Sequence, residues 1–443
     1  MKHNKMSRLL SVMLCLMLVA VLVVEAPAAH ACTSVQLESA EGDAYWFRTC
    51  DMDDSYNVFG ENGSYIASSY LVSYPAGVPI EMASGTITPD HTVIGMSFSD
   101  SLAMLDGMND AGLICGLQNF LEGTSFPVEN LPEGGRSLAA MEAVTWFLAQ
   151  CSNVEEVRAL AENTYVSALL VDGVLGSDYA ATMHLVFVDA EGNSVVLEAT
   201  DPENPGRFTV YESNGVMSNS PTYPESMAIL DDYVSNSTEL FHRGFDKITL
   251  NGIDFGGEKK GDKTFPASYA SRDRFVRMSM MRWLADEGNK IANEDMLVMG
   301  STLMSTVMAP HQNDNQLYYY NYMTEDNEVK GGGVDTYTQY TVAYDSARRT
   351  MAIRPYDSAV WTTLSVSEVP TDARTTYPFH RGLEGGTVSA VTVAAQGTEA
   401  APEAAPEAAP EAAQGTNIWM ICTVVLGIAV VVLLVMNSRK KKD

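Results

Sequence analysis

The stretch AHACTSVQLE, residues 29–38, places a cysteine directly after a protease cleavage signal. The tripeptide at residues 29–31 has the small-x-small pattern of a signal-peptidase site, and it follows a basic start and an apolar run at residues 9–24. We therefore expect residues 1–31 to be a secretory signal peptide. Its removal makes Cys32 the first residue of the exported chain, at the start of a strand-like run.

A cysteine at a chain terminus carries its own base. The thiolate is the reactive form, and an ordinary cysteine has a pKa of about 8.5, so a nearby group must take up the thiol proton. The α-amine of an N-terminal residue, with a pKa of about 7.7 to 8.0, can accept this proton and later return it to a leaving amine. Cys32 is therefore a candidate nucleophile of the N-terminal type.

Two other interpretations of Cys32 stay open on its position alone. The first is a lipoprotein cysteine acylated at sulfur, although residues 29–31 lack the aliphatic residue and small pair that normally precede such a cysteine. The second is a structural cysteine that happens to follow a cleavage site. Further residues along the chain favour the nucleophile.

The C-terminal end has the pattern of a membrane anchor. Residues 382–416 contain Pro-Glu-Ala-Ala three times, which predicts a semi-stiff extended stalk, with a short helical stalk as the alternative. Residues 417–437 include an uncharged run of 19 residues, long enough for a membrane-spanning helix. Because residues 438–443 are basic, the positive-inside rule predicts a cytoplasmic tail and a single-pass type I protein of the cell membrane, with the domain at residues 32–381 extracellular.

The composition excludes several classes of partner and site. The chain carries 27 Lys and Arg against 56 Asp and Glu, a net charge of −29, which argues against electrostatic binding of nucleic acid or of an anionic membrane surface. No Cys-x-x-Cys pair occurs, and no His, Cys and Asp cluster has metal-ligand spacing. We therefore expect no metal, no cofactor and no disulfide framework. Four cysteines lie in the expected exported part: Cys32, Cys50, Cys115 and Cys151.

The body at residues 32–381 mixes strand and helix patterns. Polar, glycine-containing turns at residues 38–43 and 189–193 join strand-like runs and predict hairpins. Antiparallel hairpins with helices inserted between them predict an α+β fold in which sheets are covered by helices. The strand-like runs are residues 34–37, 44–47, 91–98, 113–116, 184–189, 194–197, 340–344 and 350–354, and the helical patterns are residues 137–150, 153–163, 223–233 and 272–286.

Ordered motifs across the body resemble those of the choloylglycine hydrolase family, which includes bile salt hydrolases and penicillin V acylases. The opening CTSV at residues 32–35 is followed after a hairpin by FRTCDMD at residues 47–53. The resemblance keeps its order through residue 355. It continues with DGMNDAGL at residues 106–113, NF at 119–120, the hairpin at 184–198, SNSP at 218–221, RDRFVR at 272–277 and YTVAYD at 340–345.

The resemblance implies an N-terminal-nucleophile hydrolase, with two antiparallel sheets sandwiched between helical layers and a non-peptide C–N amide bond as its target. Cys32 is then the nucleophile, and Asp51 orients its α-amine. Arg48 and Arg274 lie near the thiol, where their positive charge favours the thiolate and steers the substrate. A turn aspartate and surface arginines are the ordinary alternatives for these three residues.

The same resemblance assigns the oxyanion donors. Asn219 offers its side-chain amide to the developing oxyanion, and Asn119 supplies a second donor. The family block reads Gly-Leu-Asn-Phe or a tyrosine variant, whereas this chain reads GLQNF at residues 116–120, so Gln118 competes with Asn119 for the second place.

These observations predict a cell-surface hydrolase of small-molecule N-acyl amides, with conjugated bile salts, penicillin V and other acyl amides as the candidate substrates. The alternatives are a catalytically silent, membrane-anchored binding protein on the same fold and a cysteine peptidase with an internal nucleophile. Relatives are often homo-oligomers, which is an additional expectation for this chain.

Overall fold

The computed structural model divides the chain into two compact units, residues 1–393 and 394–443. The expected signal peptide up to residue 30, the stalk, the membrane helix and the basic tail lie outside the described residues. Among the residues that are described, no helix is long and apolar enough to cross a bilayer. The structure describes residues 31–53, 69–98, 103–119, 131–167, 183–235, 248–250, 253–255, 266–287, 290–310, 322–323, 329–330, 336–356 and 358–377.

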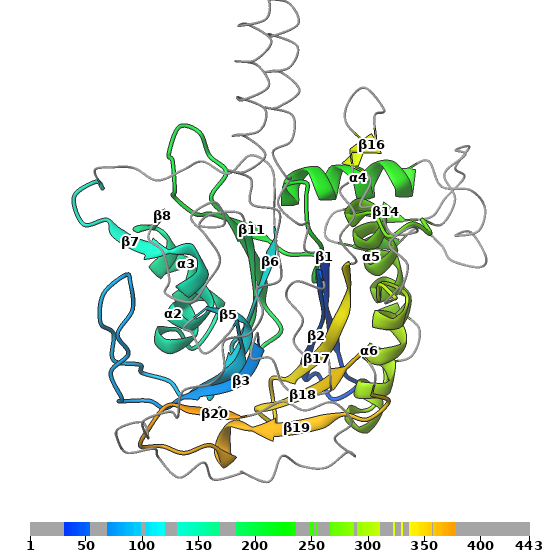
Figure 1. Ribbon diagram of the computed structural model, residues 1–443. Helices are drawn as coiled ribbons and strands as arrows, with labels where there is room; N and C mark the ends of the chain where they lie inside the picture. Colours follow the sequence, from blue (N-terminus) through cyan, green and yellow to red (C-terminus); the bar gives the residue numbers. More distant parts are fainter. Residues whose placement is uncertain are drawn as a thin grey trace, which may run out of the picture. The chain divides into compact units, whose positions relative to one another are not determined.

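Two antiparallel sheets form the centre of the first unit and face each other (Figure 1). The six-stranded sheet has the order β12-β1-β2-β17-β18-β19, with β1 at Ala31–Glu38, β2 at Ala44–Asp53, β12 at Val216–Met217, β17 at Thr336–Asp345, β18 at Thr350–Pro355 and β19 at Thr362–Ser365. The eight-stranded sheet has the order β11-β10-β9-β6-β5-β4-β3-β20, with β3 at Ser69–Tyr74, β4 at Val93–Phe98, β5 at Met104–Asn109, β6 at Ile114–Asn119, β9 at Met183–Val188, β10 at Ser194–Glu198, β11 at Thr209–Glu212 and β20 at Thr375–Tyr377.

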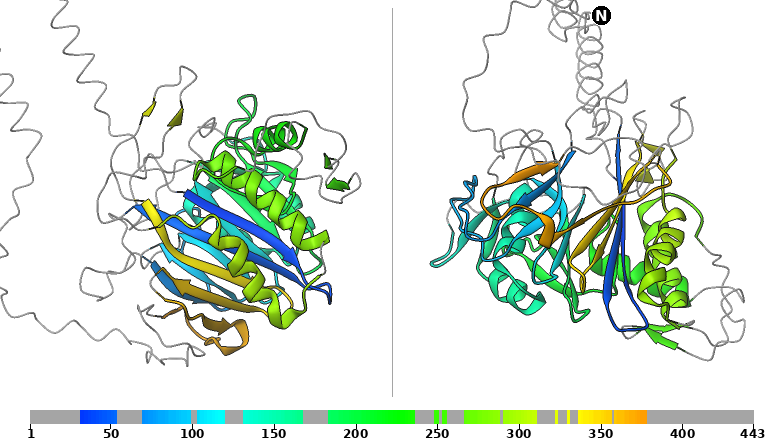
Figure 2. Two further views of the ribbon diagram at one scale, coloured as in Figure 1. Left: turned by 90° about the vertical axis from the view of Figure 1, so that its right-hand side faces the viewer. Right: turned by 90° about the horizontal axis from the view of Figure 1, so that it is seen from below.

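Helices cover the outer face of each sheet (Figures 1 and 2). Three apolar clusters separate the layers, one beneath each set of helices and one between the sheets. The expected helix-sheet-sheet-helix sandwich is therefore confirmed. Helices α2 (Ala143–Gln150) and α3 (Val154–Ala161) cover the eight-stranded sheet, and α4 (Tyr223–Ser235), α5 (Ser271–Glu287) and α6 (Met296–Ser305) cover the six-stranded sheet.

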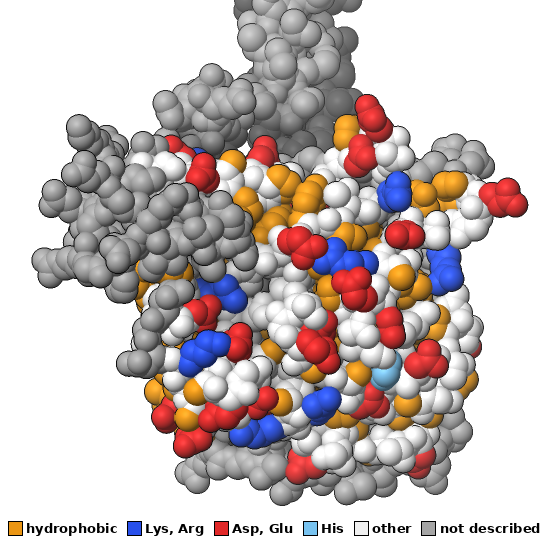
Figure 3. Space-filling model, turned by 180° about the vertical axis from the view of Figure 1, so that it is seen from behind, with side chains coloured by type: hydrophobic (Ala, Val, Ile, Leu, Met, Phe, Trp, Pro, Cys, Tyr) orange, Lys and Arg blue, Asp and Glu red, His pale blue; other side chains and the backbone are white. Residues whose placement is uncertain are grey.

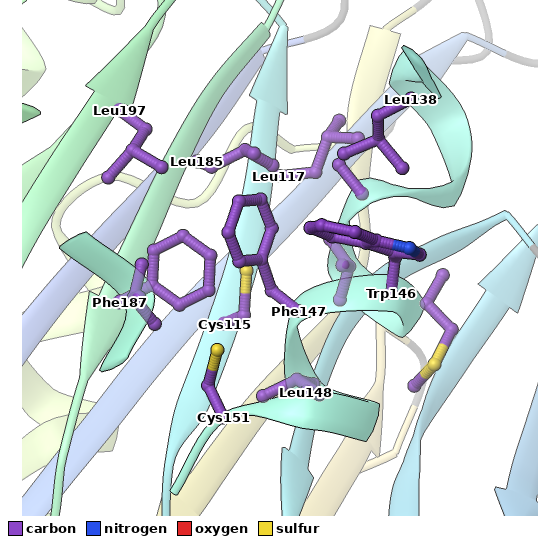
Figure 4. Packing of buried hydrophobic residues seen from close by; sticks show 14 of the residues in the cluster. Cys115, Leu117, Leu138, Trp146, Phe147, Leu148, Cys151, Leu185, Phe187 and Leu197 are labelled. Carbon is purple, nitrogen blue, oxygen red and sulfur yellow. The ribbon is translucent and has the colours of Figure 1, made fainter. Parts of the chain in front are cut away.

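The helix-side core of the eight-stranded sheet is built around aromatic side chains. Phe147 of α2 packs edge-on against Phe187 of β9, with ring centroids 5.3 Å apart. Figure 4 shows these rings among leucines from three neighbouring strands, with Cys115 and Cys151 below them. Every residue of β5 and β6 is buried, because one face meets this core and the other meets the second sheet.

The remaining elements are short. β7 (Arg136–Ala139) runs parallel to β8 (Thr164–Ser167). Two small hairpins and three 3₁₀ turns complete the described chain, namely β13 (Ile248–Leu250) with β14 (Ile253–Phe255), β15 (Tyr322–Met323) with β16 (Val329–Lys330), and η2 (Ala140–Glu142), η5 (Asn293–Asp295) and η6 (Val366–Glu368).

The structure contains strands that were not among the expected runs, such as β3, β5 and β19, and it differs from the expected helices at two places. The helix expected at residues 137–150 begins only at Ala143, because pairing with β8 holds residues 136–139 as strand β7. Helix α6 was not among the expected helices. Its Gly300 packs against the ring of Phe47 so closely that a Cβ would lie 2.1 Å from a ring carbon, a tertiary contact that sequence periodicity does not report.

Charged side chains of both signs are scattered over the face of the molecule shown in Figure 3. On the face shown in Figure 3, acidic side chains are widely spread and basic ones lie singly among them. Such a surface lacks the basic stripe that follows a nucleic-acid backbone on the part of this face that the structure describes.

The turn between β5 and β6 ties the two sheets together and yields a stability prediction. Gly112 has φ +90°, its carbonyl accepts a hydrogen bond from Ser346 Oγ at 2.7 Å, and a Cβ there would lie 2.6 Å from the Ser346 carbonyl oxygen. Gly42 has the same φ but no atom within 4 Å of its Cβ position. Both Gly→Ala changes impose backbone strain, and we expect Gly112→Ala to cost about 1–3 kcal/mol more because it also forces the sheets apart.

Chemical denaturation of the two variants measures this difference. Equal losses of unfolding free energy for Gly112→Ala and Gly42→Ala would show that the turn does not constrain the sheets.

Candidate active site

Cys32 is held through its backbone at the start of β1. Its N–H donates to Asn219 Oδ1 at 2.6 Å, and its carbonyl accepts from Arg274 Nη1 at 2.8 Å and from Ser218 Oγ at 3.3 Å. The residue is 3% exposed. In this structure Ala31 precedes Cys32 in the strand, so the nitrogen of Cys32 is a peptide amide. Both polar groups of the Cys32 backbone thus point away from β2, towards β12 and α5.

Asn219 and Arg274 form a pair that holds this backbone. Arg274 Nη2 donates to Asn219 Oδ1 at 2.9 Å, and Arg274 Nε donates to the Tyr269 carbonyl at 2.9 Å. The backbone N–H of Asn219 donates to Ser271 Oγ at 2.9 Å, and its Nδ2 donates to the Asn119 carbonyl at 2.8 Å. Both side chains are therefore fixed in position, and the Asn219 amide bridges from the nucleophile strand to β6.

Arg48 approaches Cys32 from the other side. Its Nη2 donates to Cys32 Sγ at 3.2 Å and to the Leu117 carbonyl at 2.8 Å, while its Nη1 donates to the Asp106 carboxylate. Arg48 lies on β2, and Asp106 lies on β5 in the opposite sheet, so the guanidinium spans the layer between the two sheets. The contact with sulfur places a permanent positive charge beside the thiol, which favours the thiolate.

Asp106 balances the buried charge of Arg48, and two tyrosines hydrogen-bond to the Asp106 carboxylate. Tyr344 OH donates to Asp106 Oδ1 at 2.6 Å, and Tyr340 OH donates to Asp106 Oδ2 at 3.2 Å. Burial raises the pKa of Asp106, and Arg48 acts in the opposite direction. Burial alone would lower the pKa of Arg48, but electrostatic interaction with Cys32 foremost, and then with Cys50 and Asp106, raises it well above its ordinary value. Arg48 therefore stays charged inside the sandwich.

The match to a family model begins at the same cysteine. Residues 32–374 match the model of the linear amide C–N hydrolases of the choloylglycine hydrolase family. The chain belongs to the choloylglycine hydrolase family. It is therefore a linear amide C–N hydrolase, as its motifs predicted.

Several relatives are about one quarter identical to the chain over the aligned residues. The bile salt hydrolase/transferase of Clostridium perfringens is 27% identical over 289 residues, which cover 61% of this chain and 80% of that protein. The bile salt hydrolase/transferase of Bifidobacterium longum is 26% identical over 335 residues, 74% of this chain and 96% of that protein. The penicillin V acylase of Pectobacterium atrosepticum is 25% identical over 194 residues, 42% of this chain and 44% of that protein.

Solved structures of the family share the fold. A variant of the conjugated bile acid hydrolase of Clostridium perfringens matches with a TM-score of 0.58 and 20% identity, over 79% of this chain and 97% of that one. The penicillin V acylase of Agrobacterium tumefaciens matches with a TM-score of 0.55 and 18% identity, over 80% of this chain and 95% of that one. At these identities the likeness supports the N-terminal-nucleophile fold and not a substrate.

Four of the site residues expected in this hydrolase make direct contacts: Cys32, Arg48, Asn219 and Arg274. Asn119 joins them through its backbone carbonyl, which accepts from Asn219. The side chain of Gln118 points to the six-stranded sheet, where Nε2 donates to Ser34 Oγ at 2.6 Å. Because neighbouring strand residues point to opposite faces, the two candidates for the second oxyanion donor face different layers.

Asp51 lies in β2 directly opposite Ala31, next to the Cys32 backbone. Its Oδ1 accepts from Thr338 Oγ1 at 2.6 Å. Burial, and then the charge of Cys32, raise the pKa of Asp51 to about 7, against the opposing effect of Arg274. The positive charge of Arg274 is therefore not enough to bring the pKa of the Asp51 carboxyl back to its ordinary value.

Asp106, Tyr340 and Tyr344 were quoted in the sequence motifs but given no role there. The sequence did indicate that Asp106 is unusual, because it lies within the apolar strand MLDGMN. A buried acid of this kind requires a hydrogen-bonding or charged partner. The identity of that partner, Arg48 from another sheet, could not be read from the strand alone.

The raised pKa of Asp51 predicts the pH dependence of stability in a chain that keeps Ala31. The folded state holds the Asp51 proton up to pH of about 7, whereas the unfolded state releases it near the ordinary value of 3.8. This contribution to stability is complete below pH 3.8 and is lost as the pH rises through 7, and it amounts to at most about 4 kcal/mol.

The parent chain should lose unfolding free energy between pH 5 and pH 8, and Asp51→Asn should lose less, because the asparagine has no proton to release. Chemical denaturation of both proteins at the two pH values measures these losses. The same pH slope in both proteins would show that Asp51 ionises normally.

Proposed function

We propose that the protein is a cell-surface hydrolase of N-acyl amides in which Cys32 is the nucleophile and its own α-amine, freed by signal cleavage, is the general base. One observation carries the proposal: two different side chains bind the nitrogen and the sulfur of Cys32. Asn219 accepts from the Cys32 nitrogen, while Arg48 donates to the Cys32 sulfur. Such an arrangement positions a thiol and an adjacent amine for proton transfer.

The reaction begins when the α-amine takes the thiol proton and the Cys32 sulfur attacks the amide carbonyl carbon. Asn219 Oδ1 keeps its hydrogen bond to the Cys32 nitrogen and, with Asp51 on the neighbouring strand, orients the amine. The amine then returns the proton to the leaving nitrogen, the C–N bond breaks, and a thioester remains on Cys32. Water, deprotonated by the same amine, attacks the thioester, releases the acid and restores the thiol.

Asn219 also contributes to the oxyanion site. A side-chain amide nitrogen carries two hydrogens, and among the described residues Nδ2 of Asn219 has one acceptor, the Asn119 carbonyl. Its second hydrogen is proposed to donate to the developing oxyanion. Asn119 and Gln118 stay the two candidates for the second donor, and the side chain of Gln118, which points to the six-stranded sheet that holds Cys32, is the better placed of the two. Arg274, which fixes the Asn219 amide, keeps that donor in position.

The proposed location rests on the two ends of the chain. The cleavage pattern before Cys32 directs export, and the apolar run at residues 417–437 with its basic tail provides a type I anchor. The stalk at residues 382–416 then carries the hydrolase domain away from the membrane. Export and activation become one proteolytic event, because the cut that releases the signal peptide also creates the base. A homo-oligomeric state stays a prediction.

The proposed substrate joins an apolar acyl group to a polar amine. The relatives named above are hydrolases of bile salts and of penicillin V. Glycine and taurine bile conjugates, penicillin V and long-chain acyl amides are therefore the compounds to compare. The net charge of −29 slows the encounter with anionic conjugates at long range, which favours a neutral or weakly charged substrate.

Release of amine from these compounds, side by side, tests the proposal. We expect turnover of at least one class, and a loss of at least about 10³-fold in kcat/KM for Cys32→Ala, because the nucleophile is removed. Cys151→Ala is the matched control, since Cys151 lies in the apolar core beneath α2 and should leave turnover unchanged. A chain that retains Ala31 should also be inactive, because its base is tied up as an amide.

Three results would contradict the proposal. Turnover by Cys32→Ala equal to that of the parent excludes Cys32 as the nucleophile. Activity in the chain that retains Ala31 indicates an internal nucleophile, as in a cysteine peptidase, that does not need a free α-amine. No turnover of any compound by a protein processed before Cys32 supports the silent binding protein instead.

A further inference from the structure

Cys50 faces Cys32 across two neighbouring strands. The two residues are directly opposite each other in the antiparallel pair of β1 and β2, and both are buried cysteines that form no disulfide (Figure 1 shows the strands). The proposed reaction uses Cys32 alone and gives Cys50 no role. A second thiol directly opposite a nucleophilic one requires a physical explanation.

The backbone hydrogen bonds show that the two cysteines form a close pair. The N–H and the carbonyl of Cys32 are both engaged on the side away from β2, with Asn219 and Arg274. Cys32 and Cys50 are therefore a non-hydrogen-bonded pair, for which the Cα atoms are about 4.5 Å apart. A disulfide requires a Cα separation of about 4.4–6.8 Å, so the strands can be bridged without large movement.

The two thiols differ in their surroundings. Arg48 donates to the sulfur of Cys32, which favours a reactive thiolate. Burial raises the pKa of Cys50 well above its ordinary value, and a hydrogen bond to Cys32 raises it further. Cys32 is thus the thiol that reacts with an oxidant, and Cys50 is a protonated thiol in contact with Cys32.

We propose that Cys50 is a resolving cysteine, and that peroxide converts the Cys32–Cys50 pair into a reversible disulfide that blocks the nucleophile. The formation of the disulfide rests on the geometry alone, and only its effect on turnover rests on the proposed role of Cys32. An exported protein meets oxidants more often than a cytosolic one, so protection of the thiol is useful there.

The chemistry proceeds in two balanced steps. The Cys32 thiolate attacks one peroxide oxygen, the O–O bond breaks, and Cys32 sulfenic acid forms with release of hydroxide. The Cys50 sulfur then attacks the Cys32 sulfur, the S–O bond breaks, and the oxygen leaves as water with the proton of Cys50. The thiol pair loses two electrons and two protons, and the peroxide is reduced to two waters.

The disulfide should be easily reduced. In a non-hydrogen-bonded pair the Cα atoms are about 4.5 Å apart, at the short end of the range for disulfides, whose commonest Cα separation is about 5.5–6 Å. The bridge therefore strains the β1 and β2 pair, and strained disulfides are the more readily reduced ones. A dithiol should restore Cys32.

A second thiol pair in the chain provides a matched internal control. Cys115 and Cys151 lie near each other in the apolar core of the eight-stranded sheet (Figure 4). Burial raises the pKa of both, that of Cys151 to about 12, and among the described residues no arginine or lysine donates a hydrogen bond to either sulfur as Arg48 does to Cys32. Proximity without an activated thiolate should not give a disulfide at low peroxide.

The test treats the purified full-length protein with hydrogen peroxide, alkylates the remaining thiols and maps peptides without reduction. We expect a peptide joined between Cys32 and Cys50 that lacks two hydrogens, with Cys115 and Cys151 alkylated. Turnover should fall by at least about tenfold and recover with dithiothreitol. In Cys50→Ala and Cys50→Ser the joined peptide is absent, Cys32 gains two oxygens, and dithiothreitol does not restore turnover.

Two results would overturn the proposal. One is oxidation of Cys32 to the sulfinic acid in the parent protein without a joined peptide. The other is recovery of the Cys50 variants to the same extent as the parent. Because the peptide map does not depend on turnover, an inactive protein still reports whether the disulfide forms, and so the two proposals fail separately.

Discussion

The buried guanidinium of Arg48 is the constraint on which the rest of the site depends. It contacts the Cys32 sulfur, the Leu117 carbonyl and the Asp106 carboxylate, and so it reaches from the nucleophile strand to both central strands of the opposite sheet. A cation inside a protein is tolerated only when it is paired with an anion and hydrogen-bonded, as both terminal nitrogens of Arg48 are, and removing one partner of such a pair costs about 3–5 kcal/mol. The two sheets are therefore held at the one relative position in which this charge is satisfied.

The second constraint acts on the backbone of Cys32. Asn219 and Arg274 hold its N–H and its carbonyl, which turns both groups away from β2. This orientation has two consequences. It places the nitrogen that cleavage converts to an amine beside an acceptor, and it makes the Cys32 and Cys50 pair one of the close pairs of the sheet. The proposed general base and the proposed disulfide thus follow from the same two hydrogen bonds.

The sequence predicted the layers of the fold and named residues that the structure brings together around Cys32, while their catalytic roles stay predictions. Cys32 follows a cleavage pattern, and Arg48, Asn219 and Arg274 lie in family motifs, so each could be assigned from local residues. The link from Asp106 to Arg48 could not, because it joins strands in different sheets. Local pattern also misplaced the start of α2, where pairing of β7 with β8 overrides helical periodicity, and it did not reveal α6. The predicted hairpin turn at residues 38–43 sets the register in which Cys32 lies opposite Cys50. This pairing could not be derived from the sequence, because it requires the exact ends of both strands.

The most direct measurement traps the covalent intermediate. The protein processed before Cys32 is mixed with an amide that it hydrolyses, quenched in acid within the first turnover, and digested for peptide mapping. The account predicts that the acyl group is attached to the sulfur of Cys32, at the new N-terminus, and that Arg48→Ala lowers the amount that accumulates. An acyl group on any other side chain, or turnover without an acylated Cys32, would contradict it.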